Sequence, residues 1–258
     1  MIRSFILLLI LGMVACQSAD TTTANPPADG FNLEASDQKA IALADEVMES
    51  MGGRKAWDEA RYFAWTFFGF RNLLWDKQTG DVRVEVPRDS LTILVNIKDG
   101  SGKVKKAATE YTHPDSLAKF LGNGKNIWIN DAYWLVMPFK LKDSGVTLKY
   151  DAAGTTQDGK AADILQLTFE NVGNTPNNKY LVYVDKESKL VTQWDFFANA
   201  TDPEPRFSTP WADYKSYGKL RLSGNRGQRS LTNIAVPETL PSDYFSSLEA
   251  IDWTAIAQ

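Results

Sequence analysis

Asp81-Val82-Arg83-Val84-Glu85-Val86 alternates a charged residue with valine along the whole stretch. A β-strand places successive side chains on opposite faces, so this period of two predicts a strand with one dry and one wet face. Similar alternation occurs in four further runs: Leu91 to Ile97, Leu165 to Phe169, Tyr180 to Val184, and Leu190 to Phe196. Short polar turns separate the runs, which predicts an antiparallel meander rather than strands joined by crossover helices.

The stretch from Tyr62 to Phe70 reads Tyr-Phe-Ala-Trp-Thr-Phe-Phe-Gly-Phe and is apolar on both of its strand faces. A strand of this kind has to be covered on both sides. We therefore expect a helix against one face, and either a second layer or a ligand against the other.

Helical patterns occur in two places. Ser36 to Met51 has apolar residues at helical spacing, with Ser36 as the candidate N-cap and Gly52-Gly53 as the stop, and residues 55–60 add a predicted short turn. Pro114 to Leu121 starts a helical insertion. A second, short apolar helix is predicted to begin at Asn130 or Asp131 and to end before Pro138.

Together these patterns predict a β-dominated α+β fold. The expected architecture is a curled antiparallel sheet, an incomplete β-barrel, wrapped around an N-terminal helix and a short helical insertion. We find no internal repeat and no second boundary, so residues 33–258 are predicted to form a single domain.

The N-terminus has the pattern of a bacterial lipoprotein signal peptide over residues 1–15. A basic start is followed by an apolar run from Phe5 to Val14, and Met13-Val14-Ala15-Cys16 resembles a lipobox. An apolar run of this length is too short to span a bilayer, which needs about 20 residues. Cys16 is the expected lipidation site, and residues 16–32 are the expected flexible tether. Gln17 after this cysteine favours the outer membrane, with the periplasmic face as the expected location.

Composition argues against several classes of function. The chain has a formal net charge of −4 and no long basic run, so we do not expect nucleic-acid binding. With one histidine and one cysteine, it offers no multi-histidine metal site and no intramolecular disulfide. No nucleophile elbow, phosphate loop or metal loop occurs, so we expect neither a cofactor nor a metal, and no enzyme activity.

The expected lipidated N-terminus, leading helix, curled sheet and helical insertion resemble the LolA, LolB and LppX type of fold. The segments at residues 63–69, 130–135 and 165–173 are also similar to uncharacterised outer-membrane lipoproteins of Bacteroidota, with the likeness extending roughly from Ala44 to Phe197. The carrier fold implies an incomplete barrel, closed by helices, that holds acyl chains in an apolar cavity.

The aromatic load, which includes 8 tryptophans, suggests an aromatic-lined cavity. Our candidate ligand-binding residues lie on the expected dry faces: Trp65, Phe67, Trp134, Tyr183, Trp194 and Phe196. For any one of them, plain core packing is the stronger interpretation. Asp76 and Asp131 each follow or lie near an aromatic residue, and turn formation or helix capping explains them better than chemistry. His113 is interpreted as an exposed loop residue.

These observations predict a membrane-anchored periplasmic lipoprotein that binds or passes a lipid or a lipoprotein acyl chain. The alternative is a structural or interaction lipoprotein of the envelope, with a filled core and no ligand. A void above about 300 Å³ would favour ligand binding. A hydrolase would instead need two carboxylates about 5 to 9.5 Å apart in a cleft.

Overall fold

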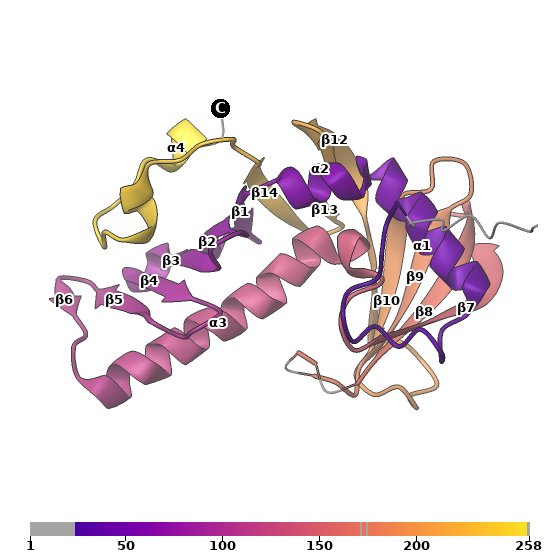
Figure 1. Cartoon of the computed structure of the whole chain (residues 1–258), viewed down its shortest axis with the longest axis horizontal. Helices are drawn as coiled ribbons and strands as arrows, with labels where there is room; N and C mark the ends of the chain where they lie inside the picture. Colours follow the sequence, from indigo (N-terminus) through magenta and orange to yellow (C-terminus); the bar gives the residue numbers. More distant parts are fainter. Residues whose placement is uncertain (1–23, 171, 174, 257–258) are drawn as a thin grey trace, which may run out of the picture.

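The structure is a computed structural model that describes residues 24–170, 172–173 and 175–256. Its strands form two antiparallel sheets that do not close into a barrel, and its helices pack against them (Figure 1). The helices are α1 (Gln38–Ser50), α2 (Gly53–Glu59), α3 (Pro114–Val136) and α4 (Trp253–Ile256), with 3₁₀ turns η1 (Pro87–Asp89), η2 (Met137–Lys140) and η3 (Ser242–Phe245). The predicted β-dominated α+β class is thus confirmed.

The larger sheet has nine strands in the order β12-β13-β14-β1-β2-β3-β4-β5-β6. These are β1 (Tyr62–Phe67), β2 (Arg71–Asp76), β3 (Asp81–Val86), β4 (Leu91–Asn96), β5 (Gly102–Lys106), β6 (Thr109–Glu110), β12 (Ala212–Tyr217), β13 (Leu220–Arg226) and β14 (Arg229–Ala235). Helix α3 runs along one face of this sheet (Figure 1) and contacts β3, β4 and β5. The β1 residues Phe63, Trp65 and Phe67 are buried in the core on that side.

The opposite face of this sheet is covered by residues 237–256, which we call the C-terminal segment. Ala64 of β1 and Leu74 of β2 are buried in a second apolar cluster with Ile256, and Phe245 and Trp253 pack against them. The strand part of the Tyr62–Phe70 stretch is therefore covered by protein on both sides, with a second layer rather than a ligand over the outer face, whereas Phe70 lies in the turn after β1 and is exposed.

Arg83 corrects the prediction of a wet face on β3. Its side chain is fully buried, and its guanidinium donates to the Ser247 carbonyl at 2.8 Å and the Glu249 carbonyl at 2.6 Å, and to the Glu85 carboxylate at 2.6 Å. The charged side of the alternating pattern faces the C-terminal segment, whose backbone carbonyls replace water as hydrogen-bond acceptors.

The smaller sheet has five strands in the order β11-β10-β9-β8-β7. These are β7 (Val146–Thr155), β8 (Ala161–Phe169), β9 (Lys179–Asp185), β10 (Val191–Phe197) and β11 (Phe207–Pro210). Leu165 pairs with Val182, which pairs with Trp194, so the apolar sets predicted for these strands share one face. Helix α1 contacts β7 and lies beside this sheet (Figure 1).

Three details of the predicted fold are wrong. The strands belong to two sheets rather than one. The helical insertion is not short, because α3 continues through Asn130 and Asp131 to Val136, where the carboxylate of Asp131 pairs with Arg71 instead of capping a new helix. The N-cap of α1 is Asp37, while Ser36 accepts a hydrogen bond from the Leu148 amide at 3.0 Å.

Residues 24–32 lie against the domain. The Ala28 amide donates to the Lys142 carbonyl at 2.9 Å, the Asn32 amide donates to the Val146 carbonyl at 3.0 Å, and Phe31 is buried in the core. The last part of the stretch predicted as a tether, residues 24–32, therefore contacts the domain. Within the described ranges, no helix is both long and apolar enough to cross a membrane.

Two glycines of α3 allow a direct test of how the helix meets the sheet. Gly124 is buried, and a Cβ there would lie 2.7 Å from Cγ2 of Ile93, whereas a Cβ at the exposed Gly122 would meet nothing within 4 Å. We expect Gly124→Ala to lower the free energy of unfolding by about 1 to 3 kcal/mol through overpacking. Gly122→Ala should raise it by up to about 1 kcal/mol through helix propensity. Urea denaturation of both variants measures the difference, and equal effects would contradict this packing.

Candidate ligand-binding site

A pocket of about 360 Å³ lies between α3 and the five-stranded sheet. Its walls come from β2, the second half of α3, the segment after η2, the end of β8 and the start of β9. The lining residues are Trp75, Trp128, Ile129, Asn130, Ala132, Tyr133, Trp134, Val136, Lys140, Asp143, Ser144, Val146, Phe169, Val172, Gly173, Thr175 and Tyr180. Most of this lining is aromatic or aliphatic, which suits an apolar ligand.

The aromatic walls are built from rings that support one another. Trp75 meets Trp128 edge to face with centroids 5.2 Å apart. Tyr133 lies 5.7 Å from Tyr180, which meets Phe169 edge to face at 5.7 Å. Edge-to-face and tilted contacts of this kind fix the orientation of each ring. The walls are therefore held by contacts within the protein and do not need a ligand to define them.

The polar groups of the aromatic side chains in these walls are uncharged. Burial raises the pKa of the Tyr133 hydroxyl well above its usual value and that of Tyr180 to about 12, so both phenols keep their protons at neutral pH. Among the described residues, no hydrogen-bond partner is found for the Tyr133 hydroxyl or for the indole nitrogens of Trp75 and Trp128. Buried donors usually have acceptors. These three donors have none among the described residues, so the site combines apolar walls with unpaired hydrogen-bond donors.

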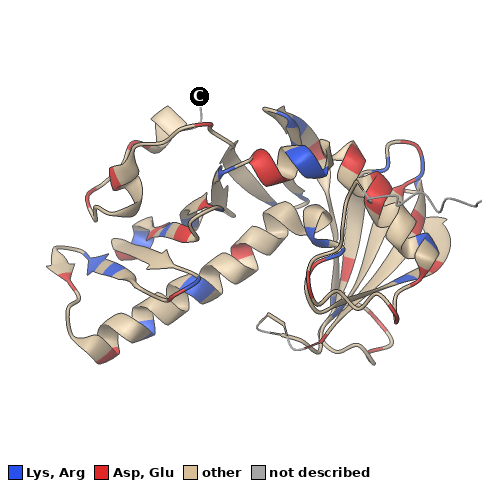
Figure 2. Ribbon diagram, viewed as in Figure 1, with Lys and Arg blue, Asp and Glu red and all other residues tan. Residues whose placement is uncertain are grey.

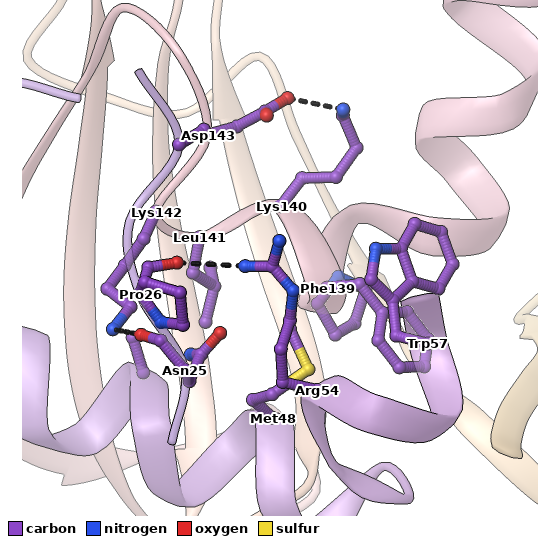
Figure 3. Close-up of a pocket in the computed structure, with 13 residues that line it drawn as sticks. Asn25, Pro26, Met48, Arg54, Trp57, Phe139, Lys140, Leu141, Lys142 and Asp143 are labelled. Carbon is purple, nitrogen blue, oxygen red and sulfur yellow. Dashed lines mark hydrogen bonds and ion pairs between the residues drawn. The ribbon is translucent and has the colours of Figure 1, made fainter. Parts of the chain in front are cut away.

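The charged groups of the lining are Lys140 and Asp143, which form an ion pair with each other. Both residues also line a second, smaller pocket of about 80 Å³ beside α1 and α2. Figure 3 shows Arg54 and Lys142 in this smaller pocket, together with the Lys140–Asp143 pair at one side of it. Trp57 and Phe139 stack at 4.5 Å in its wall.

Of the six residues predicted to bind ligand, Trp134 lines the larger pocket. Trp65 and Phe67 of β1 are buried in the core, where Phe67 lies 6.4 Å from Trp134, and Trp194 is buried with 1% exposure. Phe196 is half-buried against Phe207 at 5.0 Å. Tyr183 lies on the other face of its sheet, paired with Gln193, and donates a hydrogen bond to Asp195 at 2.7 Å. A dry strand face marks core residues, but it does not say where that core is left unfilled.

Trp75, Trp128, Tyr133, Phe169 and Tyr180 line the pocket and were not among the predicted site residues. A helical period carries part of the missing signal, because Trp128, Ala132 and Val136 recur every four residues and share one helix face. Continuing one helix through Asn130-Asp131 would have placed them together.

The other candidates have structural roles or positions. Asp76 accepts hydrogen bonds from Arg61 at 2.7 Å and from the amides of Gln78 and Thr79; burial opposes ionisation, but these bonds keep its pKa below the usual value. His113 is exposed at the start of α3. The described part of the chain contains no group of three or more His, Cys, Asp or Glu side chains that could hold a metal ion. The predicted signal peptide and Cys16 lie outside the described residues.

No protein-family model and no curated protein matches this chain. Among solved structures, it is similar to a DUF1329 family protein from Desulfovibrio piger, with 13% identity and a TM-score of 0.45 over 81% of this chain and 99% of that one. It is also similar to MucB in its complex with MucA, with 11% identity and a TM-score of 0.24 over 71% of this chain and 61% of the other.

Proposed function

We propose that this protein is a binding protein rather than an enzyme, and that it holds a lipid or the acyl chain of a lipoprotein in the pocket between α3 and the five-stranded sheet. The observation that carries the proposal is the pocket itself, with aromatic walls from Trp75, Trp128, Tyr133, Phe169 and Tyr180. A lipid carrier function is also what the resemblance to the LolA, LolB and LppX type of fold implies.

The volume of the pocket supports ligand binding over the alternative of a filled core. At about 360 Å³ it falls within the range of ligand pockets, which is about 300 to 1,000 Å³. Trp65 and Trp194 are tightly packed core residues that do not line the pocket, although Trp194 contacts its wall residues Trp134 and Tyr180. The protein thus combines tightly packed core residues with an unfilled, largely apolar region, which suits a binding protein better than a purely structural one.

The proposed setting is the periplasmic face of the outer membrane, where acyl chains on Cys16 would anchor the protein. The support is the N-terminal sequence, with its short apolar run and the chain's single cysteine. Each buried methylene contributes about 0.8 kcal/mol, so two or three acyl chains hold a protein on a membrane firmly. An anchor of this kind would keep the pocket close to a source of lipid.

Filling the pocket tests the proposal. Ala132 is buried in the lining, so Ala132→Phe would occupy ligand space. In a titration of the purified full-length protein with a fluorescent fatty acid, we expect Ala132→Phe to weaken binding at least tenfold. Ala153→Phe, at an exposed position of β7 outside the pocket, should bind like the original protein.

Trp134→Ala provides a second variant, because it removes one wall of the pocket rather than filling it, and it should weaken binding several-fold. Thermal unfolding of each variant shows that it is folded. Failure of the unaltered protein to take up any fatty acid, together with a ligand-free mass in native mass spectrometry, would contradict the proposed function.

A further inference from the structure

One ion pair borders both pockets. Lys140 is the last residue of η2, and Asp143 follows three residues later in the segment leading to β7. Both residues line the aromatic pocket and also the smaller pocket beside α1 and α2. A ligand that fills the aromatic pocket from end to end therefore reaches this pair. The charges of Lys140 and Asp143 then decide which chemical group of the ligand can bind there.

The smaller pocket is rich in cationic groups. Its charged lining residues are Arg54, Lys140, Lys142 and Asp143 (Figure 3). The Arg54 guanidinium is held by Asp58 at 2.8 Å and by the Pro26 carbonyl at 2.8 Å. Lys142 pairs with Asp45, which does not line the pocket. Three cations and one anion thus face this space, although α1 and α2 as a whole carry both acidic and basic residues (Figure 2).

Lys140 is the cation that can change partners at low cost. The side chains of Lys140 and Asp143 are 35% and 37% exposed, and exposed ion pairs contribute about 0 to 1 kcal/mol. Lys142, by contrast, has 5% of its side chain exposed and is held by Asp45 and the Asn25 carbonyl. An incoming anion would therefore replace Asp143 at Lys140 more readily than it would displace Asp45 from Lys142.

The aromatic pocket provides a path that leads to this lysine. Trp128, Ala132 and Val136 lie in line along α3, which advances about 12 Å between the first and the last of them. Lys140 comes one further turn along the chain. An extended apolar chain lying along this face of α3 would start beside the contacting rings of Trp75 and Trp128 and would place its other end at Lys140.

We propose that the ligand is an amphipath with an anionic head group, a carboxylate or a phosphate, and that Lys140 binds this head group in exchange for Asp143. This inference rests on the proposed function, because it assigns the polar end of the ligand whose apolar part occupies the aromatic pocket. Lys140 is then the residue that selects anionic over neutral ligands. Asp143 is the partner of Lys140 when no ligand is bound.

Ligands that share one alkyl chain but differ in the head group test the assignment. Dodecanoate, dodecyl phosphate and dodecanol are titrated into the full-length protein by displacement of a fluorescent fatty acid. We expect dodecanoate or dodecyl phosphate to bind better than dodecanol, and Lys140→Gln to weaken anion binding about fivefold while leaving dodecanol unchanged. Asp143→Asn should strengthen anion binding, since it removes the competing carboxylate.

Lys149→Gln is the matched control, because Lys149 pairs with Asp37 and lies outside both pockets. Its affinities should equal those of the unaltered protein. Preference for one of the two anions identifies the head group. The inference is overturned if Lys140→Gln leaves anion binding unchanged, or if it weakens dodecanol to the same degree. Binding of no ligand at all would overturn the proposed function, and the inference with it.

Discussion

Replacing Trp194 by alanine should lower the free energy of unfolding by about 3 to 5 kcal/mol, the largest effect expected for a single core residue. The indole has 1% of its side chain exposed and lies 4.7 Å from Trp134, 5.0 Å from Tyr180 and 5.4 Å from Trp211. Its loss leaves a cavity bounded by rigid rings, which cannot move inward to fill it. Guanidinium denaturation monitored by circular dichroism measures the change.

Trp194→Phe is the control for this prediction. No hydrogen-bond partner is found for the Trp194 indole nitrogen within the described part of the chain, so replacement by phenylalanine removes side-chain volume but no hydrogen bond. It should therefore lower the free energy of unfolding by less than Trp194→Ala does. Trp194 does not line the pocket, but it supports the lining residues Trp134 and Tyr180 from behind. A Trp194→Ala variant as stable as Trp194→Phe would contradict the role of this indole in filling the core.

Asp131→Ala is expected to lower the free energy of unfolding by about 3 kcal/mol, since it leaves the charge of Arg71 without its partner. The Asp131 side chain is fully buried, and it accepts hydrogen bonds from Nε of Arg71 at 2.7 Å and Nη2 at 2.9 Å. This two-pronged contact joins α3 to β2. Burial raises the pKa of Asp131, while the hydrogen bonds from Arg71 and Asn130 act in the opposite direction.

Two companion variants make the Asp131 test specific. Asp115→Ala removes an exposed acidic residue from the first turn of the same helix and should cost less than about 1 kcal/mol. The double variant Arg71→Met/Asp131→Leu removes both charges and should recover most of the stability lost in Asp131→Ala. An Asp131→Ala variant as stable as Asp115→Ala would show that the pair does not contribute to holding α3.

Local patterns predicted much of the fold because they report the geometry of the backbone itself. The helix at residues 38–50 and the alternating strands around Leu165, Val182 and Trp194 follow from periods of 3.6 and two. The break expected at Asn130-Asp131 is wrong for a non-local reason. Arg71, sixty positions earlier in the chain, donates two hydrogen bonds to the Asp131 carboxylate. This pairing allows a buried carboxylate in the middle of a helix.

The pocket was predictable in kind but not in place. Aromatic content pointed to an aromatic-lined cavity, and Trp134 does line one. The remaining walls depend on how α3 crosses from one sheet toward the other, which brings Trp75 of β2 together with Tyr180 of β9. No spacing along the chain encodes that meeting, because it depends on contacts between separate sheets.

By itself, the sequence determined that the alternating segments, such as Asp81–Val86 and Leu165–Phe169, become strands and that neighbouring strands run antiparallel, because alternation and short turns act locally. Only the tertiary structure decided what covers the second face of the Asp81–Val86 strand. Arg83 looked like a solvent-facing residue, and it is buried because carbonyls of the C-terminal segment, more than 160 residues further along the chain, accept its hydrogen bonds. Burial of a charge depends on finding partners, and those partners are brought to it by the fold.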